Sequence, residues 1–555
     1  MIIDALTLPA DTLLETDICI IGAGAAGITI ARELSNQPYE VCILESGGLG
    51  FDAATQSLYE GDNVGTKYFP LKESRARYLG GSTNLWGGWS RPLDEIDFEH
   101  RSWMPYSGWP VSRSELLPYY HRAQQACHLG PLEYDIDYWQ AGLAEQQLQV
   151  PSLGDDVITH LWQVIPPTHV RFGEAYRSEL EQARNIKTYL HANVVEIETN
   201  DTAGAVTQLR VASLDGKQFS MKAKTFILAV GGIENPRMLL LANKVQSCGL
   251  GNQHDLVGRF FMEHPILWSG KVSYSQQASH TPYFEIDNTF MATGFGLPKP
   301  VQQREQVLNF SLRIKPVVEE WLLAINRLQY KMQQSKASQD LAAIVDGHKY
   351  EFGLPQKDSS VIEDLSKIIA NSDRVLAKIY AKLLQKSTAE PVVYRTHLIS
   401  EQAPNPDSRI TLSRERDRLG LNQVNLDWRL SPIDKYTVQR SQQVIAQEFE
   451  RYDLGKMHIE LTEDDAAWET VKGSYHHMGT TRMSNNPREG VVDENCQVHG
   501  VGNLYVAGSS VFPTSGLSNP TLTIVALAIR LADQIKQQMQ DPPSTAHTTS
   551  TTLVA

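Results

Sequence analysis

Two side-chain types that can handle the proton of an alcohol lie near the C-terminal end of the chain. Residues 475–483 have the sequence YHHMGTTRM, and Asn519 and Pro520 follow 36 residues after this segment, at the start of an apolar stretch. A neutral imidazole can accept a hydroxyl proton at neutral pH, and a primary amide can hold the same oxygen in place. If both groups meet beside a flavin, they could deprotonate an alcohol while its carbon-bound hydride leaves for the ring.

A nucleotide-binding turn is predicted at the opposite end of the chain. Residues 17–21 (DICII) have the apolar character of a buried strand and run directly into Gly22-Ala23-Gly24-Ala25-Ala26-Gly27. The apolar spacing of residues 28–34 predicts that a helix follows at once. In such a unit Gly22 allows the tight turn, Gly24 lets the backbone approach a pyrophosphate, and the third glycine lets helix and strand pack closely.

An acidic residue stands where a ribose is expected. Residues 39–44 (YEVCIL) predict a second buried strand, which ends at Glu45, eighteen residues after Gly27. A carboxylate here can accept hydrogen bonds from ribose hydroxyls and would repel a 2′-phosphate, which disfavours NADP. The motif does not separate NAD from FAD, and an ordinary glycine-rich turn is the alternative interpretation.

Size, charge and cysteine spacing exclude several classes of protein. The chain has 555 residues, 41% of them hydrophobic, which predicts a globular protein of two domains. The net charge of -14 and the pI near 5.6 argue against nucleic acid and anionic membrane surfaces as partners. The five cysteines are scattered, so neither a metal site nor a disulfide framework is expected.

No targeting or integral membrane segment is expected. Residues 1–17 are acidic and carry neither a basic region nor a twin-arginine pair, which favours a cytoplasmic protein. Residues 501–529 lack charge but are interrupted by glycines and prolines, so strand, loop and buried helix are expected there. The polar tail at residues 541–555 is expected to be disordered.

Apolar strand patterns recur in separated parts of the chain. Residues 186–197, 225–232 and 503–507 each predict a strand, and their composition is typical of a parallel sheet. Helical patterns between residues 316 and 390 predict a helical cap over a sheet. We therefore expect a cofactor-binding domain from residues 1–96, 186–266 and 471–540, and a substrate domain from residues 97–185 and 267–470.

Six motifs in a fixed order carry a resemblance to the glucose-methanol-choline (GMC) oxidoreductases. They are GAGAAG with LESGG, LGGSTN at 79–84, AVGGIENPRMLLL at 229–241, VGRFFMEH at 257–264, HHMGTTRM at 476–483, and the C-terminal VVDENCQVHGVGNLYVAGSSVFP with NPTLT. The resemblance implies an α/β fold with a discontinuous, Rossmann-like FAD-binding domain of the GMC and p-hydroxybenzoate hydroxylase type. An α+β substrate domain with a sheet and a helical cap would accompany it. The NPTLT segment at 519–523 is most similar to the branch of pyranose oxidases and bacterial sugar dehydrogenases.

The resemblance implies a role for each of the two side chains that could handle the proton. His476 matches the catalytic base of the family, and its neighbour His477 should face the other way, because adjacent side chains of an extended segment point apart. Asn519 would donate its amide N–H to the same substrate oxygen, although capping the helix that starts at Pro520 is an alternative role.

The resemblance also implies which residues bind FAD. The helix that begins at Pro520 and Thr521 would aim its N-terminus at the flavin and stabilise the negative charge of the reduced ring. Gly80, Gly81 and Asn84 would pass against the ring, and tight surface turns are their alternative. The expected cofactor-binding set is Gly22, Gly24, Ala25, Ala26, Gly27, Glu45, Ser46, Gly80, Gly81, Asn84, Val194, Gly508, Ser509, Pro520 and Thr521.

Two positions depart from the pattern of the family. Leu85 stands where pyranose oxidases carry the histidine that bonds covalently to the flavin, so we expect FAD to be bound without a covalent link. Gly508 stands where most members have an aspartate beside the ribityl chain, so its contact would come from the backbone. Val194 would likewise contact adenine through its backbone.

Together these features predict an FAD-dependent enzyme that oxidises a small-molecule alcohol. The family branch implies a sugar or glycoside secondary hydroxyl as the substrate group, with a specialised-metabolite alcohol as the alternative. A non-redox lyase on the same fold, and a flavin-stabilised scaffold without catalysis, are further alternatives. The electron acceptor could be O2, a quinone or a redox partner protein.

Overall fold

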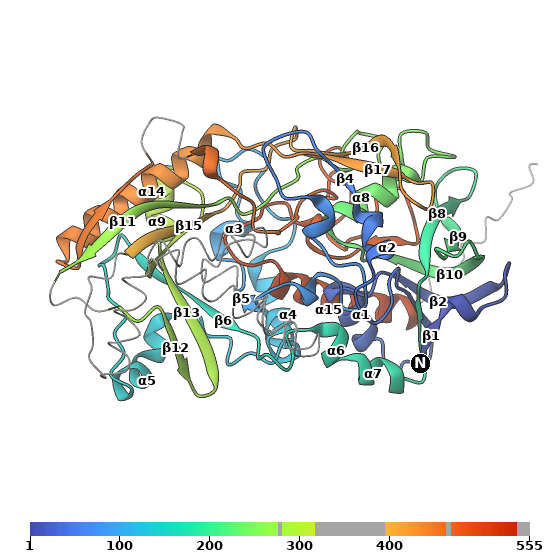
Figure 1. Cartoon of the computed structure of the whole chain (residues 1–555), viewed down its shortest axis with the longest axis horizontal. Coiled ribbons are helices and arrows are strands. Elements are labelled where there is room, and N and C mark those ends of the chain that lie inside the picture. Colours follow the sequence, from blue (N-terminus) through green and yellow to red (C-terminus); the bar gives the residue numbers. More distant parts are fainter. Residues whose placement is uncertain (276–279, 317–393, 462–467, 541–555) are drawn as a thin grey trace, which may run out of the picture.

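The computed structural model describes residues 1–275, 280–316, 394–461 and 468–540. The predicted helical cap and the C-terminal tail lie outside these residues. The described chain forms two large sheets, one on each side of the view in Figure 1, with a smaller third sheet along the upper edge.

The first sheet is the predicted parallel sheet, and it is assembled from separated segments. Its order is β1-β7-β3-β2-β10-β9-β8, and β19 pairs with the carboxyl end of β10. The parallel strands are β1 (Ile2–Asp4), β7 (Ile186–Leu190), β3 (Val41–Leu44), β2 (Leu13–Ile21), β10 (Gln218–Leu228) and β19 (Leu504–Val506). Two antiparallel strands, β9 (Val206–Ala212) and β8 (Asn193–Thr199), complete it. The predicted α/β class and the Rossmann-like sheet are therefore confirmed.

One strand prediction is wrong. Residues 186–197 were expected to form a single strand, but the structure divides them into β7 and β8 at His191 and Ala192. His191 has a positive φ of 57°, and its N–H donates to the carbonyl of Gly47. The chain therefore turns there, and β8 pairs with β9 at the other edge of the same sheet.

Helices from the two ends of the chain pack side by side against this sheet. In both views α15 (Thr521–Gln540) lies close to α1 (Ala25–Glu33) and α4 (Arg113–Ala126). Arg122 of α4 forms ion pairs with Glu33 of α1, at 2.5 Å, and with Asp533 of α15. The apolar face of α15 is buried in the same core as β2 and β10. This packing fixes the starts of α1 and α15 relative to one another.

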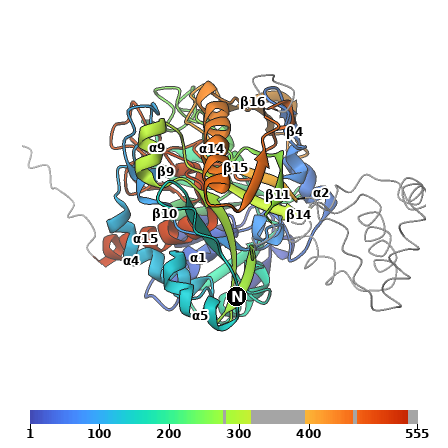
Figure 2. The same cartoon turned by 90° about the vertical axis from the view of Figure 1, so that its left-hand side faces the viewer.

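The second sheet is antiparallel. Its order is β18-β11-β15-β14-β13-β6-β5, and β12 pairs with β13. The strands are β5 (Trp89–Ser90), β6 (Ile158–Val164), β11 (Ile266–Tyr274), β12 (Tyr283–Ile286), β13 (Thr289–Gly296), β14 (Phe310–Pro316), β15 (Tyr394–Ser400) and β18 (Gly455–His458). Helix α14 (Pro432–Arg451) covers one face and packs on β14 and β15 (Figure 2). Leu312, Leu398 and Phe449 are fully buried in the core between them.

The third sheet joins β16 (Arg409–Arg416), β17 (Asn422–Asp427) and β4 (Gly61–Asn63). The remaining α-helices are α2 (Ala53–Gln56), α3 (Glu95–Phe98), α5 (Gln140–Glu145), α6 (Phe172–Ala175), α7 (Arg177–Gln182), α8 (Gly231–Leu241) and α9 (Lys299–Glu305). Because β4 pairs with β17, and α4 packs on α1 and α15, the proposed domains share elements across their borders. The boundaries at residues 96, 185, 266 and 470 stay a prediction.

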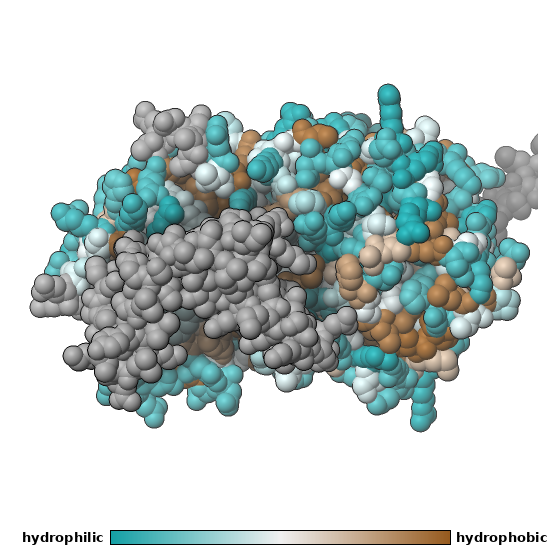
Figure 3. All heavy atoms as spheres, in the orientation of Figure 1, coloured by the Kyte–Doolittle hydropathy of each residue, from teal (hydrophilic) through white to brown (hydrophobic). Residues whose placement is uncertain are grey.

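The described surface is mainly hydrophilic in the view of Figure 3, with apolar patches between the polar side chains. Every helix in the described ranges is too short or too polar to cross a bilayer.

A buried ion pair ties the loop after α3 to the end of β15. Arg101 donates to both carboxylate oxygens of Glu401, at 2.6 and 2.7 Å, and the two side chains are 1% and 0% exposed. Since Glu401→Gln would leave the Arg101 charge buried without its counter-charge, we expect the free energy of unfolding to fall by about 3–5 kcal/mol. Thermal and urea unfolding of the variant measure this loss.

The matched control is Asp156→Asn, which breaks the Arg304–Asp156 pair. Those side chains are 52% and 38% exposed, so water screens the pair. We expect the control to unfold at the temperature of the parent. Equal losses in both variants would mean that burial of the Arg101–Glu401 pair adds no stability.

Candidate active site

The glycine turn between β2 and α1 has three positions with different spatial demands. Gly22 has a φ of 99°, which disfavours any residue with a side chain. A Cβ atom on Gly27 would lie 2.0 Å from the carbonyl oxygen of Gly22, so only glycine fits there. A Cβ atom on Gly24 would meet no atom within 4 Å. Ala25 and Ala26 then form the first turn of α1, whose free N–H groups face the same open side.

Open space of this kind recurs at the ends of three neighbouring parallel strands. Gly24, Gly231 and Gly508 follow β2, β10 and β19, and an added Cβ atom would meet nothing within 4 Å at any of them. Gly231 and Gly508 also have positive φ angles, of 88° and 115°. Ligands of open α/β sheets bind at the carboxyl ends of such strands, and the bare backbone here fits FAD. Sequence reasoning missed Gly231, although the paired glycines after β10 were a signal.

The loop that contains Gly80, Gly81 and Asn84 lies against the glycine turn. The Gly80 N–H donates to the carbonyl of Ala23 at 2.9 Å, and a Cβ atom on Gly81 would lie 3.0 Å from the Cα atom of Gly24. Asn84 donates its amide to the carbonyls of Leu79 and Gly81, at 3.0 and 2.9 Å. Asn84 therefore shapes the loop, and the loop borders the predicted nucleotide site.

Glu45 holds the glycine turn through hydrogen bonds to its backbone. Its carboxylate accepts the N–H of Ala23 at 2.9 Å and the N–H of Gly47 at 2.8 Å, one on each oxygen. Burial raises the pKa of Glu45, while these two hydrogen bonds oppose the shift. The sequence did not predict the bonds to backbone, and binding of ribose by the remaining lone pairs stays a prediction.

The remaining predicted contacts lie on the same side of the sheet. The Ser46 hydroxyl lies 2.5 Å from the side-chain oxygen of Asn193, which places the start of β8 and Val194 beside Ser46. Ser509 follows Gly508 and donates its hydroxyl to the carbonyl of His477 at 2.7 Å. Helix α15 begins at Thr521, one residue later than the predicted start at Pro520, so Asn519 lies two residues before this helix N-terminus.

The structure brings His476 and Asn519 together from positions 43 residues apart. The Asn519 amide Nδ2 lies 3.4 Å from Nε2 of His476, and both side chains are half-buried. The other amide atom, Asn519 Oδ1, has no hydrogen-bond partner in the described part of the chain. Burial lowers the pKa of His476 well below its usual range, and the positive charge of Arg313, and of His264 and His477 when they are protonated, lowers it further.

A second histidine supports His476 from behind. His264 is fully buried, and its Nδ1 lies 2.8 Å from Nδ1 of His476. The carboxylate of Glu263 accepts the backbone N–H groups of His264, Ser474 and His476 through one oxygen, at 3.0 to 3.1 Å. The strand-like segment that carries His476 is thereby pinned to the segment that carries His264.

His477 faces the opposite side, as expected for adjacent residues. Its Nε2 lies 2.9 Å from the hydroxyl of Tyr68, which also bonds to the free oxygen of Glu263. Burial lowers the pKa of His477 to about 3. The side chain is 8% exposed and packs against Phe261, so it belongs to the supporting structure.

Sequence reasoning missed the roles of Glu263, Tyr68, Ser474 and His264. The Glu263-His264 pair before Pro265 was the available signal, because buried acidic and imidazole groups cluster at functional sites. No group of three or more metal-binding side chains occurs among the residues that the structure describes.

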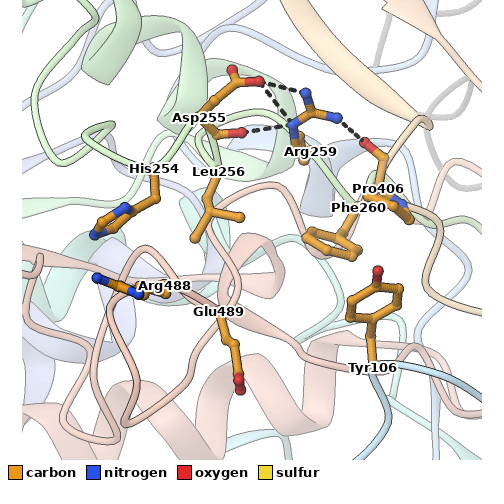
Figure 4. A pocket seen from close by; sticks show the side chains of 9 residues that line it. All are labelled: Tyr106, His254, Asp255, Leu256, Arg259, Phe260, Pro406, Arg488 and Glu489. Atoms are coloured by element: carbon orange, nitrogen blue, oxygen red, sulfur yellow. Dashed lines mark hydrogen bonds and ion pairs between the residues drawn. The ribbon is translucent and has the colours of Figure 1, made fainter.

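A surface pocket of about 310 Å³ has a lining that includes none of these groups (Figure 4). It is lined by Tyr106, His254, Asp255, Leu256, Arg259, Phe260, Pro406, Arg488 and Glu489. Arg259 is already bonded to Asp255 and to the carbonyl of Pro406. None of the lining residues bonds to His476 or Asn519, so we place the candidate active site at the histidines.

Two family models match the chain. A model described as "GMC oxidoreductase" matches residues 404–528, and a model described as "FAD dependent oxidoreductase" matches residues 17–246. The first contains His476 and Asn519, and the second contains the glycine turn, Glu45 and the loop with Gly80.

Known proteins are similar to this chain over different lengths. The fructose dehydrogenase large subunit of Gluconobacter japonicus is 23% identical, over 95% of this chain and 99% of its own. A C-glycoside 3-oxidase of Arthrobacter globiformis is 34% identical, over 22% of this chain and 23% of its own. The crystal structure of a formate oxidase superposes with a TM-score of 0.56 and 16% identity, and covers 96% of this chain and 100% of that one.

The different spaces at Gly24 and Gly27 allow a test of the nucleotide site. We expect Gly27→Ala to lower the melting temperature of the protein without its cofactor, because the new methyl group would collide with the Gly22 carbonyl. Gly24→Ala should leave that temperature unchanged and weaken FAD binding by at least tenfold, because its methyl group enters the open space.

Differential scanning fluorimetry and titration with FAD measure the two effects separately. Gly50→Ala is the control, since an added Cβ atom there also meets nothing within 4 Å and lies outside the turn. Parent-like FAD affinity in Gly24→Ala would contradict this placement of the cofactor.

Proposed function

Since this chain belongs to the GMC family of FAD-dependent oxidoreductases that act on alcohol groups, we propose that His476 and Asn519 carry its reaction. The observation that supports this most strongly is the approach of Asn519 Nδ2 to His476 Nε2, at the N-terminus of α15. The two groups can bind one hydroxyl between them. FAD, when bound, supplies the acceptor for the hydride.

The proposed roles follow from the chemistry of the two side chains. His476 accepts the hydroxyl proton at Nε2, because its lowered pKa keeps the imidazole neutral near neutral pH. Asn519 holds the alcohol oxygen and thereby orients the carbon–hydrogen bond. The half-buried position of both groups keeps most water away from the reacting atoms.

The cofactor site proposed here is the open edge formed by the glycine turn, the loop with Gly80, and the residues that follow β10 and β19. Its members are the predicted set together with Gly231. Leu85 offers no nucleophile to the flavin, which supports FAD bound without a covalent link.

The proposed substrate is a sugar or glycoside that is oxidised at a secondary hydroxyl. Similarity to a fructose dehydrogenase along the chain, and to a C-glycoside 3-oxidase in a shorter region, supports it. The proposed acceptor of the electrons is O2, a quinone or a redox partner protein.

Anaerobic mixing of the holoenzyme with a panel of sugars, glycosides and simple alcohols tests this function. We expect the flavin absorbance near 450 nm to bleach with a substrate of the panel. In His476→Ala the limiting rate of bleaching should fall by about 10²- to 10⁴-fold, since general base catalysis is lost.

His254→Ala is the matched control, because this exposed histidine lies in the surface pocket. It should bleach at the parent rate. Turnover of a substrate with an unchanged yellow spectrum would indicate a lyase instead, and parent-like bleaching in His476→Ala would remove His476 as the base.

The direction of the His476 pKa predicts a pH profile. A group whose pKa lies well below 6.5 is already deprotonated at pH 6, so acid should not remove the base in this range. We therefore expect the limiting rate of flavin reduction to stay within about twofold between pH 8 and pH 6. Stopped-flow measurements across this range check it, and a steep fall centred near pH 6.5 would contradict the lowered pKa.

A further inference from the structure

We propose that His264 is a positioning residue that fixes the tautomer of His476, so that the free lone pair of His476 lies on Nε2. The proposal rests on the proposed function, because it concerns how His476 becomes a base. It is carried by a chain of contacts from the carbonyl of Ser515 through both imidazoles to Asn519.

The series of contacts starts at the backbone carbonyl of Ser515, which can only accept a hydrogen bond. Nε2 of His264 lies 3.3 Å from the backbone carbonyl oxygen of Ser515. A carbonyl has no proton to give, so the proton of this bond must sit on Nε2 of His264. A neutral imidazole carries one ring proton, and Nδ1 of His264 is then a bare acceptor.

The second contact transfers this constraint to His476. The two Nδ1 atoms lie 2.8 Å apart, a distance that requires one proton between them. Since Nδ1 of His264 carries none, Nδ1 of His476 must donate. The proton of His476 is then on Nδ1, and its Nε2 keeps the lone pair that accepts a proton from an alcohol.

Two further neighbours agree with the same arrangement. The Ser474 hydroxyl lies 3.2 Å from Glu263 and 3.0 Å from Nδ1 of His476. It donates to the carboxylate and can therefore accept from His476. On the other side, Asn519 directs Nδ2, a donor, at Nε2 of His476 at 3.4 Å, which is compatible with an unprotonated Nε2.

The opposite arrangement would need a charged His264. A cationic His264 would donate from Nδ1 and move the proton of His476 to Nε2, where it would block the base. Burial lowers the pKa of His264 to about 4, because its fully buried ring is removed from water. Neutral His264 therefore dominates at the pH of the reaction.

The first experiment reads the tautomer directly in the holoenzyme. Long-range ¹H–¹⁵N spectra of protein labelled at histidine report which ring nitrogen carries the proton, and the signals of His476 are identified by their loss in His476→Gln. We expect a protonated Nδ1 and an unprotonated Nε2 for His476. A protonated Nε2 in the parent would overturn the proposal, whatever the variants do.

The second experiment compares two substitutions of His264. His264→Leu removes the acceptor, and we expect the limiting rate of flavin reduction to fall by on the order of 10- to 100-fold, as when the partner that orients a histidine is lost. The dissociation constant of the substrate should change little. His264→Asn retains an acceptor oxygen near the position of Nδ1. We therefore expect its rate of flavin reduction to be reduced by no more than the square root of the fold-loss in His264→Leu.

The outcomes separate this proposal from the proposed function. If the flavin does not bleach in His476→Ala but bleaches at the parent rate in both His264 variants, His476 remains the proposed base and the positioning role of His264 is wrong. If His264→Leu and His264→Asn are equally slow, and the spectra of His264→Asn still show a protonated Nδ1 on His476, the tautomer is not the cause. Melting temperature and FAD content are measured in each variant, and the parent spectra decide the matter if a variant does not fold.

Discussion

The parallel pairing of β10 with β2 and with β19 is the constraint on which the site depends. β2 comes from the start of the chain, β10 from its middle and β19 from near its end. Because the strands run in the same direction, their carboxyl ends meet at one edge, where Gly24, Gly231 and Gly508 leave the backbone bare. The packing of α15 against α1 then brings Asn519 to the same edge.

A single carboxylate organises the side of the site that faces the substrate. One oxygen of Glu263 accepts three backbone N–H groups, and the other accepts the hydroxyl of Tyr68. Burial raises the pKa of Glu263, and its hydrogen bonds, that from Tyr68 foremost, lower it. With the Ser474 hydroxyl, Glu263 accepts from five donors. A buried acid with this many donors can hold the backbone of 474–476 more firmly than apolar packing, because a shift of the segment would leave each N–H without a partner.

Much of the fold and part of the site could be predicted from the sequence, for reasons that differ between residues. The glycine turn is a local signal, since strand, turn, helix and acid occur within about thirty residues, the span of one βαβ unit. The prediction of a single strand at 186–197 was wrong because the pattern of apolar residues does not show that His191 adopts a positive φ. The contact of His264 with His476 spans 212 residues, and it depends on side-chain directions that no local pattern encodes.

The two adjacent histidines, His476 and His477, differ in surroundings that the motif alone does not show. Both are neutral, both have lowered pKa values, and both touch the network around Glu263. They differ in what lies beyond the ring. Nε2 of His477 faces the hydroxyl of Tyr68, and the ring packs against Phe261 in a buried cluster. His476 is held on one side by His264 and faces Asn519 on the other, where the amide oxygen has no partner in the described chain. A base needs one nitrogen that is anchored and one that is free to exchange a proton, and the contacts of His476 fit this requirement, which supports its proposed role.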